Sequence, residues 1–392
     1  MMKYIVLVGD GMADYPLKEL NNRTPLQFAN IPNMDRIARG GKNGLLKTIP
    51  DSMEAGSDVA NLSILGYNPE TYYTGRGPLE AAGIGIELSK DDVIFRCNLI
   101  TEENGEIIDH ASGHITTEEA KVLIELLDEK IGKEWVKFHT GISYRHILTL
   151  NRADSVTCAP PHDVIGQSIY DNMPEGNGGF LKDLIMASKE ILGGHEINIR
   201  RKKEGKRPAN MIWPWGQGKT PKIPLFKDKY GLCGAVISAV YLIKGIGKCA
   251  GMDVIDVPGA TGFLDTSYEN KAKYAIKSLE KNDFVFVHVE APDEAAHMGN
   301  LDEKIKAIER FDWMVGLIMD KLTPPYKILV LPDHFTPIPV KTHTRESVPF
   351  AIYSSEGKSD SVSSYDEESA KKGSFGKIIG ENLMNVLIEN GR

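Results

Sequence analysis

Residues 284–297 read FVFVHVEAPDEAAH, an apolar run that ends in acidic residues and a histidine. Two further runs have the same form: residues 4–10 read YIVLVGD, and residues 328–334 read ILVLPDH. Nearly continuous Val, Ile and Leu are typical of strands buried on both faces, as in a parallel sheet. The sequence therefore predicts three buried strands, each followed directly by acidic or imidazole side chains.

Helical patterns lie between these runs. From residue 303 to residue 322, apolar residues recur at spacings of three and four, which predicts a helix with one buried face. Alternating strands and helices predict an α/β fold with a mixed, mostly parallel sheet sandwiched by helices. Ligands of such sheets gather at the carboxyl ends of the strands, where the Asp and His residues of this chain stand.

The middle of the chain differs in pattern. Residues 118–131 predict an amphipathic helix and residues 144–150 a strand, whereas residues 200–207 have the composition of a loop. We predict a smaller α/β domain, residues 86–225, inserted into a catalytic domain formed by residues 1–85 and 226–392. Residues 354–373 are rich in Ser, Asp, Glu and Lys and predict a mobile surface excursion.

Length, charge and composition limit the range of possible functions. A chain of 392 residues suggests two domains, and its net charge of −8 gives no basic field for a nucleic acid backbone. The apolar run at the N-terminus is too short for a signal segment or a membrane span. The four cysteines form no C-x-x-C pair, which favours small buried side chains in a reducing compartment. We expect a cytoplasmic protein that acts on a small molecule, without a nucleic acid or membrane partner.

Several segments could together hold two divalent cations. A carboxylate follows the first run, a carboxylate and an imidazole stand at i and i+4 after another, and one adjacent pair and a single histidine follow the last run. The residues are Asp10, Asp293, His297, Asp333, His334 and His343. Alone, each has an ordinary interpretation, such as a solvated helix face or a helix cap. Their joint placement at strand ends predicts a metal site. Mixed ligands of this kind suit Mn²⁺ first, with Zn²⁺, Co²⁺ and Mg²⁺ open.

A candidate nucleophile lies in residues 54–61, which read EAGSDVAN and predict a turn into a helix. Ser57 is first of all a candidate N-cap. The amides and dipole of a helix start also favour anions, and a metal bound to the hydroxyl would make it a nucleophile for phosphoryl transfer. Residues 218–220 read GKT but lack the upstream glycine of a phosphate-binding loop, so we find no nucleotide motif.

These residues stand in motifs that run in order along almost the whole chain. They are GDGM at 9–12, residues 54–69, residues 75–85, LIKGIG at 242–247, VPGATGFLDTSYENK at 257–271, HVEAPDEAAH at 288–297, KIKAIERFD at 304–312, PDHFTP at 332–337 and THT at 342–344. The combination resembles the archaeal-type cofactor-independent phosphoglycerate mutases of the alkaline phosphatase superfamily.

The resemblance implies an alkaline-phosphatase-like fold. It also implies interconversion of 3-phosphoglycerate and 2-phosphoglycerate through a phosphoserine, without 2,3-bisphosphoglycerate. One metal would be held by Asp293, His297 and His343, and the other by Asp10, Ser57, Asp333 and His334. Lys244 would contact the phosphoryl group. The inserted domain would hold the sugar acid, close over the metals and exclude water. Its candidates are His114, Arg145, His162 and Asp163, with Asp163 and His114 acting on the substrate hydroxyls.

Two positions depart from the mutases. Trp215 and His114 stand where an Arg is expected, and the loss of bidentate guanidinium groups would weaken the grip on a doubly anionic substrate. A sister group proposed to contain homoserine kinases therefore supplies the alternative function, a related phosphotransferase. A metal-dependent phosphohydrolase and a non-catalytic binding protein are less favoured. We expect His288 to be a residue of the strand core.

Overall fold

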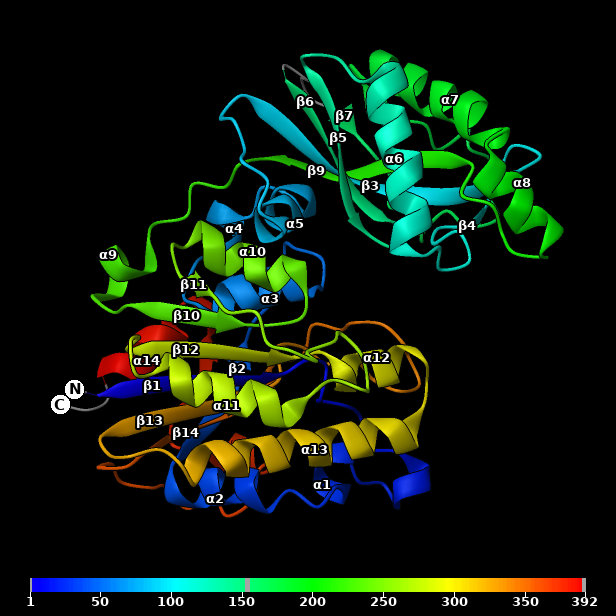
Figure 1. The fold of residues 1–392 in the computed structure, drawn as a ribbon. Helices are drawn as coiled ribbons and strands as arrows, with labels where there is room; N and C mark the ends of the chain where they lie inside the picture. The colour runs from blue at the N-terminus through cyan, green and yellow to red at the C-terminus, as the bar shows by residue number, and fades with distance from the viewer. Residues whose placement is uncertain (1, 152–155, 390–392) are drawn as a thin grey trace. The chain divides into compact units, whose positions relative to one another are not determined.

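The computed structural model describes residues 2–151 and 156–389 and divides the chain into two compact units (Figure 1). The larger unit comprises residues 1–73 and 222–392, and the smaller comprises residues 74–221. No helix in the described ranges combines the length and the apolar character that crossing a membrane requires.

The larger unit is built on an eight-stranded sheet of order β11-β10-β12-β1-β13-β14-β2-β15. Its strands are β1 (Lys3–Gly9), β2 (Lys42–Lys47), β10 (Gly234–Ile237), β11 (Asp253–Val254), β12 (Phe284–Val289), β13 (Tyr326–Leu331), β14 (Val348–Ser354) and β15 (Gly376–Ile379). Its α-helices are α1 (Pro25–Phe28), α2 (Pro32–Gly40), α3 (Ser57–Ile64), α4 (Pro69–Tyr72), α9 (Phe226–Tyr230), α10 (Tyr241–Cys249), α11 (Tyr268–Ser278), α12 (Ala291–His297), α13 (Leu301–Met319) and α14 (Leu383–Glu389). Short 3₁₀ turns cover Lys18–Leu20, Ala370–Lys372 and Gly380–Asn382.

Strands β11, β10, β12, β1 and β13 are mutually parallel, whereas β14 runs antiparallel to both β13 and β2. The register pairs Gly9 with Val289 and Val8 with Leu331, so β12, β1 and β13 end at nearly the same level. The apolar runs within residues 4–10, 284–297 and 328–334 are therefore neighbours, and the predicted mixed, mostly parallel α/β sheet is confirmed.

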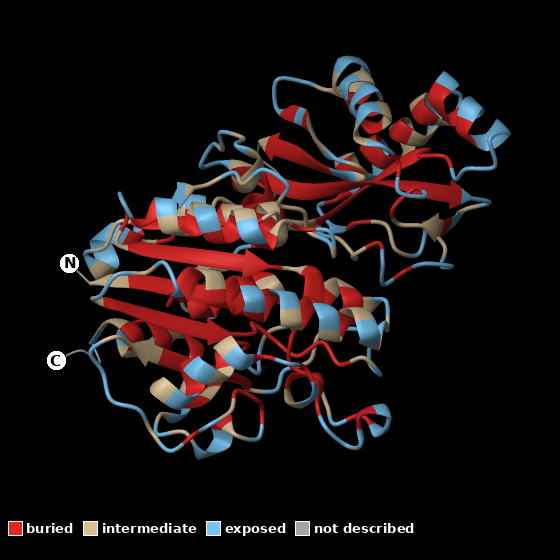
Figure 2. Cartoon of the chain, turned by 60° about the horizontal axis from the view of Figure 1, so that its bottom comes forward, coloured by how far each residue is buried: buried red, intermediate tan, exposed pale blue. Residues whose placement is uncertain are grey.

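The core of this unit forms where helices cover the sheet. Apolar side chains of α1, α2, α11 and α13 pack on one face with Ile5, Leu7 and Val287, and Figure 1 shows α11 and α13 running along the strands. The central strands are buried along their length, and the helices have one buried and one exposed side (Figure 2). Each fully buried Ile, Val or Phe contributes roughly 1.5–3 kcal/mol, so this layer holds the strand ends in fixed positions.

Helix α13 confirms the predicted helical pattern, with slightly earlier bounds. The side chain of Asn300 caps its start by accepting a hydrogen bond from the backbone N–H of Glu303 at 3.2 Å. Ile308 and Phe311 are fully buried, as their spacing predicts. A capped start and a continuous apolar stripe together account for this helix.

The prediction of a mobile surface excursion at residues 354–373 holds only for the exposed residues 356–359 and is wrong for the second half of the segment. Val362, Tyr365 and Ala370 are buried, with exposed fractions of 5%, 2% and 3%. Asp360 accepts backbone hydrogen bonds from Asn43 and Val362, and Asp366 accepts them from residues 368 and 369. The Asp and Ser residues that suggested disorder instead satisfy the backbone of a compact loop.

The smaller unit is an antiparallel sheet of order β4-β3-β6-β5 that is covered by helices. Strand β9 pairs with the edge of β3 opposite to β6. Its elements are α5 (Arg76–Ile84), β3 (Asp92–Glu103), β4 (Glu106–Asp109), α6 (Thr117–Ile131), β5 (Val136–Ile142), β6 (Arg145–Asn151), β7 (Val156–Thr157), β8 (Glu175–Gly176), α7 (Gly179–Gly193), α8 (Glu196–Lys203) and β9 (Met211–Lys219). The helix and strand predicted at 118–131 and 144–150 are confirmed as α6 and β6. The loop predicted at 200–207 is wrong in its first half, because α8 continues to Lys203 and its Arg201 is buried against Glu119.

Contacts also place the start of the smaller unit at residue 74, earlier than the predicted boundary at 86. Helix α5 packs on β3 and β9 through two glycines. A Cβ at Gly75 would lie 2.2 Å from the Gln217 carbonyl oxygen, and one at Gly77 would lie 2.6 Å from that of Ile94. The glycines thus permit a close approach that a boundary drawn from composition misses.

Candidate active site

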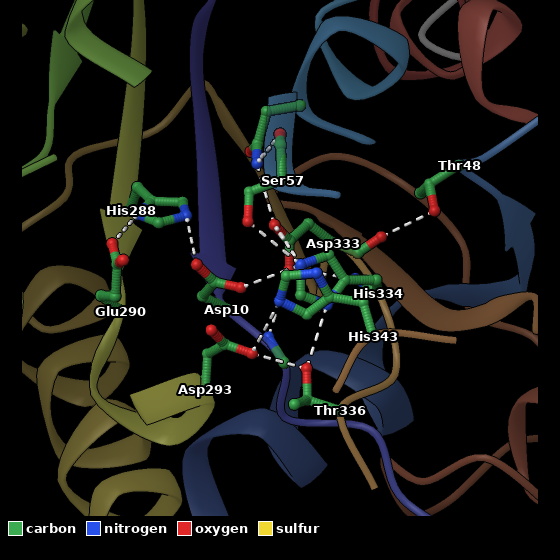
Figure 3. A network of polar contacts seen from close by, with 12 residues as sticks. Asp10, Thr48, Ser57, His288, Glu290, Asp293, Asp333, His334, Thr336 and His343 are labelled. Carbon is green, nitrogen blue, oxygen red and sulfur yellow. Dashed lines mark hydrogen bonds and ion pairs between the residues drawn. The ribbon is translucent and has the colours of Figure 1, made fainter. Parts of the chain in front are cut away.

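The carboxyl ends of β1, β12 and β13 meet at one edge of the larger sheet and place several polar residues together. Asp10 follows β1, Asp333 and His334 follow β13, and α12, which carries Asp293 and His297, begins two residues after β12. Asp10, Asp293, Asp333 and His334 are 0–4% exposed. The parallel register, together with short connections, therefore brings residues more than 300 positions apart into contact (Figure 3).

One group of possible metal-ligand atoms lies around Nε2 of His334. Ser57 Oγ lies 3.1 Å from this nitrogen, Asp10 Oδ1 lies 3.4 Å away and Asp333 Oδ2 lies 3.5 Å away. The structure therefore brings together all four residues predicted for one metal, which are Asp10, Ser57, Asp333 and His334.

A second group surrounds Nε2 of His297. This atom lies 3.0 Å from Asp293 Oδ2 and 3.1 Å from His343 Nε2, and His343 Nε2 lies 3.6 Å from Asp293 Oδ1. The three residues predicted for the other metal are thus also together. His297 and His343 side chains are 35% and 21% exposed, so solvent reaches this group.

The two groups are continuous. The rings of His334 and His343 have centroids 4.1 Å apart. Thr336 Oγ1 donates to Asp293 Oδ1 at 2.5 Å and lies 3.1 Å from His334 Nδ1 (Figure 3). Sequence reasoning missed Thr336, although it lies within the PDHFTP motif.

The buried carboxylates and imidazoles of the cluster strongly shift one another's pKa values. Burial, followed by the nearby Asp333 and Asp293 charges, raises the pKa of Asp10 well above its usual range. Burial alone would raise the pKa of Asp293, but His297 and His343 hold it well below the usual range. Burial would lower the pKa of His297, yet Asp293 raises it to about 9, whereas burial lowers the pKa of His334 to about 4. Cations would neutralise the clustered carboxylates.

The geometry fits a pair of metal ions. Ligand atoms about 2.1 Å from a cation lie roughly 3.0–3.4 Å from one another, close to the separations within both groups. Asp10 Oδ1 is buried without a hydrogen-bond partner in the described structure. Gly11, with φ of +59°, lies so close to the cluster that a Cβ there would meet Asp293 Oδ1 at 2.5 Å, so glycine is required at this position. Carboxylate oxygens and imidazole nitrogens suit Mn²⁺, Zn²⁺ and Co²⁺.

Ser57 lies at the first position of α3 rather than at its cap. The cap is Gly56, in extended conformation and without a side-chain hydrogen bond. One turn later, the Asn61 amide donates to the Ser57 carbonyl at 2.8 Å and to Asp333 Oδ2 at 2.9 Å. The serine hydroxyl is therefore not used for capping and faces the buried cluster, with the positive end of the helix dipole behind it.

Lys244 lies on α10 in the same unit. Its Nζ donates to Asp256 Oδ1 at 2.6 Å, and the Asp256 side chain is 87% exposed. Lys271 lies nearby: burial chiefly, opposed by Glu290 and assisted by the charge of Lys244, lowers its pKa to about 8. Lys271 Nζ donates to the His288 carbonyl at 2.8 Å.

The candidates of the smaller unit lie along a chain of aromatic and imidazole rings. His114 and His110 lie 6.1 and 5.8 Å from Tyr144, His110 lies 6.1 Å from His162, and His162 lies 5.1 Å from Trp215. The structure thus places His114 and His162 in one neighbourhood, and it adds His110, which the sequence did not single out.

Arg145 and Asp163 border the same rings. The Arg145 guanidinium lies 5.6 Å from the centre of the Tyr144 ring. Asp163 is 63% exposed and lies 3.7 Å from His162 Nε2. His114 has φ of +50° and follows Ser112 and Gly113, which are also left-handed. Two non-glycine residues in this region cost roughly 1–2 kcal/mol each, a strain typical of functional loops.

Trp215, which stands where an Arg is expected, is surrounded by guanidinium groups. Arg96 and Arg76 lie 5.0 and 5.8 Å from the indole ring, and both donate to Glu80 Oε1 at 2.7 Å. The indole N–H donates to Asn98 Oδ1 at 3.0 Å. Positive charge therefore lies beside this position, supplied from α5 and β3.

Comparison with known proteins agrees with this site. The family model described as 2,3-bisphosphoglycerate-independent phosphoglycerate mutase matches residues 38–198, which include Ser57. A protein with that name from Methanosarcina barkeri is 55% identical and covers 99% of this chain and 100% of its own length. One from Methanothermobacter thermautotrophicus is 49% identical, with 99% and 98% coverage.

Solved structures are similar over the same length. A protein of Pyrococcus horikoshii superimposes with a TM-score of 0.86 and 34% identity, covering 99% of this chain and 97% of its own. A cofactor-independent phosphoglycerate mutase of Thermoplasma acidophilum gives a TM-score of 0.69 and 28% identity, covering 99% of both chains. From the sequence identity and the coverage together, this chain belongs to the family of archaeal-type 2,3-bisphosphoglycerate-independent phosphoglycerate mutases.

Proposed function

We propose that this protein interconverts 3-phosphoglycerate and 2-phosphoglycerate without 2,3-bisphosphoglycerate, through a phosphoserine at Ser57. The observation that carries the proposal is the position of the Ser57 hydroxyl, 3.1 Å from His334 Nε2 within a group of buried carboxylates. Homologues that carry this enzyme name, and that align with the chain over nearly their full length, support the proposal.

Two residue sets would hold the cations. One set is Asp293, His297 and His343, and the other is Asp10, Ser57, Asp333 and His334. When bound, the cations would supply Lewis-acid stabilisation of the phosphoryl oxygens and of the serine oxygen. Mn²⁺ is the first expectation for this ligand set.

The reaction has two displacements at phosphorus. In the first, Ser57 loses its proton and its Oγ bonds to phosphorus, while the bond from phosphorus to O3 breaks and glycerate leaves with a protonated 3-hydroxyl. In the second, O2 of glycerate loses its proton and bonds to phosphorus, and Ser57 recovers its hydroxyl. Atoms and charge balance over the cycle, because no water enters and no phosphate leaves.

Hydrogen bonds around Ser57 would hold its hydroxyl in position to accept the phosphoryl group. The Asn61 amide fixes the Ser57 main chain and the Asp333 carboxylate with two hydrogen bonds. Held in this way, the hydroxyl needs little reorganisation before attack, which is the main contribution a protein makes to phosphoryl transfer.

Lys244 would stabilise the charge of the transferring group. Its pairing with Asp256 does not prevent this, because ion pairs with well-exposed carboxylates contribute only about 0–1 kcal/mol. An ammonium that exchanges this partner for a phosphoryl oxygen gains a charge-assisted hydrogen bond where charge develops.

The smaller unit would bind the glycerate part. Arg145 and His114, which both lie near the Tyr144 ring, would offer cationic or polar groups for the carboxylate, and Asp163 with His162 would exchange protons with the hydroxyls. Arg76 and Arg96 beside Trp215 restore positive charge that the replaced arginine would have supplied.

Transfer to homoserine is the second candidate, favoured by Trp215 and His114. Homoserine is a zwitterion and needs fewer guanidinium groups than phosphoglycerate. Because Arg76, Arg96 and Arg145 all lie along the same chain of rings, we favour the mutase.

An enolase-coupled assay tests the proposal. With 3-phosphoglycerate and Mn²⁺ we expect turnover that Ser57→Ala abolishes and that Ser63→Ala, a matched change on the same helix, retains. No turnover of 3-phosphoglycerate, together with formation of phosphohomoserine, would reject the mutase in favour of the alternative. Release of inorganic phosphate alone would indicate a hydrolase.

A further inference from the structure

His288 is a strand residue whose side chain faces the candidate metal cluster. It pairs with Val8 in the parallel register of β12 and β1, and its carbonyl accepts a hydrogen bond from Lys271 at 2.8 Å. Its side chain is 1% exposed. A residue fixed by a strand ladder and a buried lysine presents its ring from a rigid element.

The imidazole approaches the outer oxygen of Asp10. His288 Nε2 lies 3.2 Å from Asp10 Oδ2, whereas Asp10 Oδ1 lies 3.4 Å from His334 Nε2, so the carboxylate stands between two histidines (Figure 3). On the other side, His288 Nδ1 is 4.0 Å from Glu290 Oε2, beyond direct hydrogen-bond distance.

Both ring nitrogens of His288 are buried without a hydrogen-bond partner in the part of the chain that the structure describes. A buried polar group left in this way costs roughly 1–3 kcal/mol. The ring therefore stands close to an acceptor that a small rotation of the Asp10 carboxylate would align with it.

We propose that His288 is a positioning residue that donates its Nε2–H to Asp10 Oδ2 and so directs Asp10 Oδ1 to a cation. The inference rests on the proposed function, because it presupposes that Asp10 binds a metal. Hydrogen bonds to ligating carboxylates fix their orientation and strengthen metal binding. No proton is transferred, and the neutral imidazole acts only as a donor.

Geometry favours this role over direct ligation. Asp10, His288 and Asp333 also offer ligand atoms within 4.8 Å of one another, but the oxygens of Ser57, Asp10 and Asp333 lie at 3.1–3.5 Å around Nε2 of His334. The Asp10 oxygen nearest His288 is also the one that is not paired with His334. His288 thus approaches the Asp10 carboxylate at the oxygen that does not face His334.

A pair of amide variants tests the role. His288→Gln carries an N–H at nearly the reach of Nε2, whereas the shorter His288→Asn cannot reach Asp10. His146→Asn is the matched control, because His146 is another fully buried histidine, in the smaller unit. Mn²⁺ binding to the metal-stripped proteins is measured by titration calorimetry, after circular dichroism has verified the fold.

We expect the parent to bind two Mn²⁺, His288→Asn to bind one of them about 10–100-fold more weakly, and His288→Gln to lose less than about tenfold. His146→Asn should bind as the parent does. Equal binding by His288→Asn and the parent would overturn the inference while leaving the proposed function intact. A parent that binds no Mn²⁺ would instead refute the metal assignment itself.

Pulsed electron paramagnetic resonance supplies a second readout. The number of imidazole nitrogens bound directly to Mn²⁺ should be the same in the parent and in His288→Gln. A loss of one nitrogen would show that His288 is a direct ligand and would overturn the positioning role.

Discussion

Replacing Asp10 with Asn should have opposite effects on stability with and without metal. In the chelated protein, Asp10 is a buried carboxylate that is repelled by Asp333 and Asp293, and its Oδ1 has no hydrogen-bond partner among the described residues. Asparagine has nearly the same shape and no charge. The substitution therefore removes a cost in the absence of cations and removes a ligand in their presence.

The magnitudes follow from these contacts. An unsatisfied buried charge costs roughly 1–3 kcal/mol or more, so Asp10→Asn should stabilise the chelated protein by about that amount. At a metal concentration of about 1,000 times Kd, each site adds about 4.1 kcal/mol. Loss of one site, offset by the roughly 1–3 kcal/mol gained from removing the charge, should destabilise the loaded protein by about 1–3 kcal/mol. At roughly 2 °C per kcal/mol, Tm should rise by about 2–6 °C in chelator and fall by about 2–6 °C with metal.

Scanning calorimetry of the parent and Asp10→Asn, each in excess EDTA and in excess Mn²⁺, measures both effects. Asp51→Asn, a change at an exposed carboxylate of the same unit, is the control and should shift neither melting temperature beyond about 1 °C. A decrease in Tm for Asp10→Asn in both conditions would refute the electrostatic reasoning. So would a parent whose Tm does not respond to Mn²⁺.

Three further outcomes are expected. Lys244→Met should lower kcat in the coupled assay by about 10²–10³-fold with a smaller change in KM, because its charge acts on the transferring group; an unchanged kcat would contradict this role. Arg145→Met should raise KM for 3-phosphoglycerate by about 10–100-fold, equivalent to one charge-assisted hydrogen bond, and an unchanged KM would place the carboxylate elsewhere. Burial raises the pKa of Glu367 from 4.5 to about 7, so the folded protein binds this proton more tightly than the unfolded chain and stability falls as pH rises from about 4.5 to 7. Glu367→Gln can still hydrogen-bond Thr24, and it should flatten that dependence and stabilise the protein at pH 8 by up to about 3 kcal/mol; denaturation at pH 5 and pH 8 checks both.

The sheet and the cluster at its edge could be predicted because they depend on local patterns. Buried strands require apolar runs, and parallel strands present their carboxyl ends at one edge, so Asp10, Asp293 and Asp333 had to lie close together once β1, β12 and β13 were neighbours. For Ser57, local pattern predicted only a position at the start of a helix. Its association with the metal cluster was predicted from the motif resemblance.

Features that depend on tertiary contacts could not be predicted. A strand buried on both faces has no alternation to show which way His288 points, so its approach to Asp10 was invisible. The compact loop at residues 354–373 depends on Asp side chains that cap backbone amides, and composition alone cannot distinguish such caps from a solvated segment. The guanidinium groups beside Trp215 come from α5 and β3, far away in sequence.

Trapping the covalent intermediate tests the central claim most directly. The Mn²⁺-loaded protein would be mixed with radiolabelled 3-phosphoglycerate, quenched in acid during turnover, digested and sequenced by mass spectrometry. We predict an acid-stable phosphoryl group on Ser57, absent from Ser57→Ala and lost on a chase with unlabelled substrate. Turnover with no label on Ser57, or with the label on another side chain, would contradict the proposal that this serine carries the phosphoryl group.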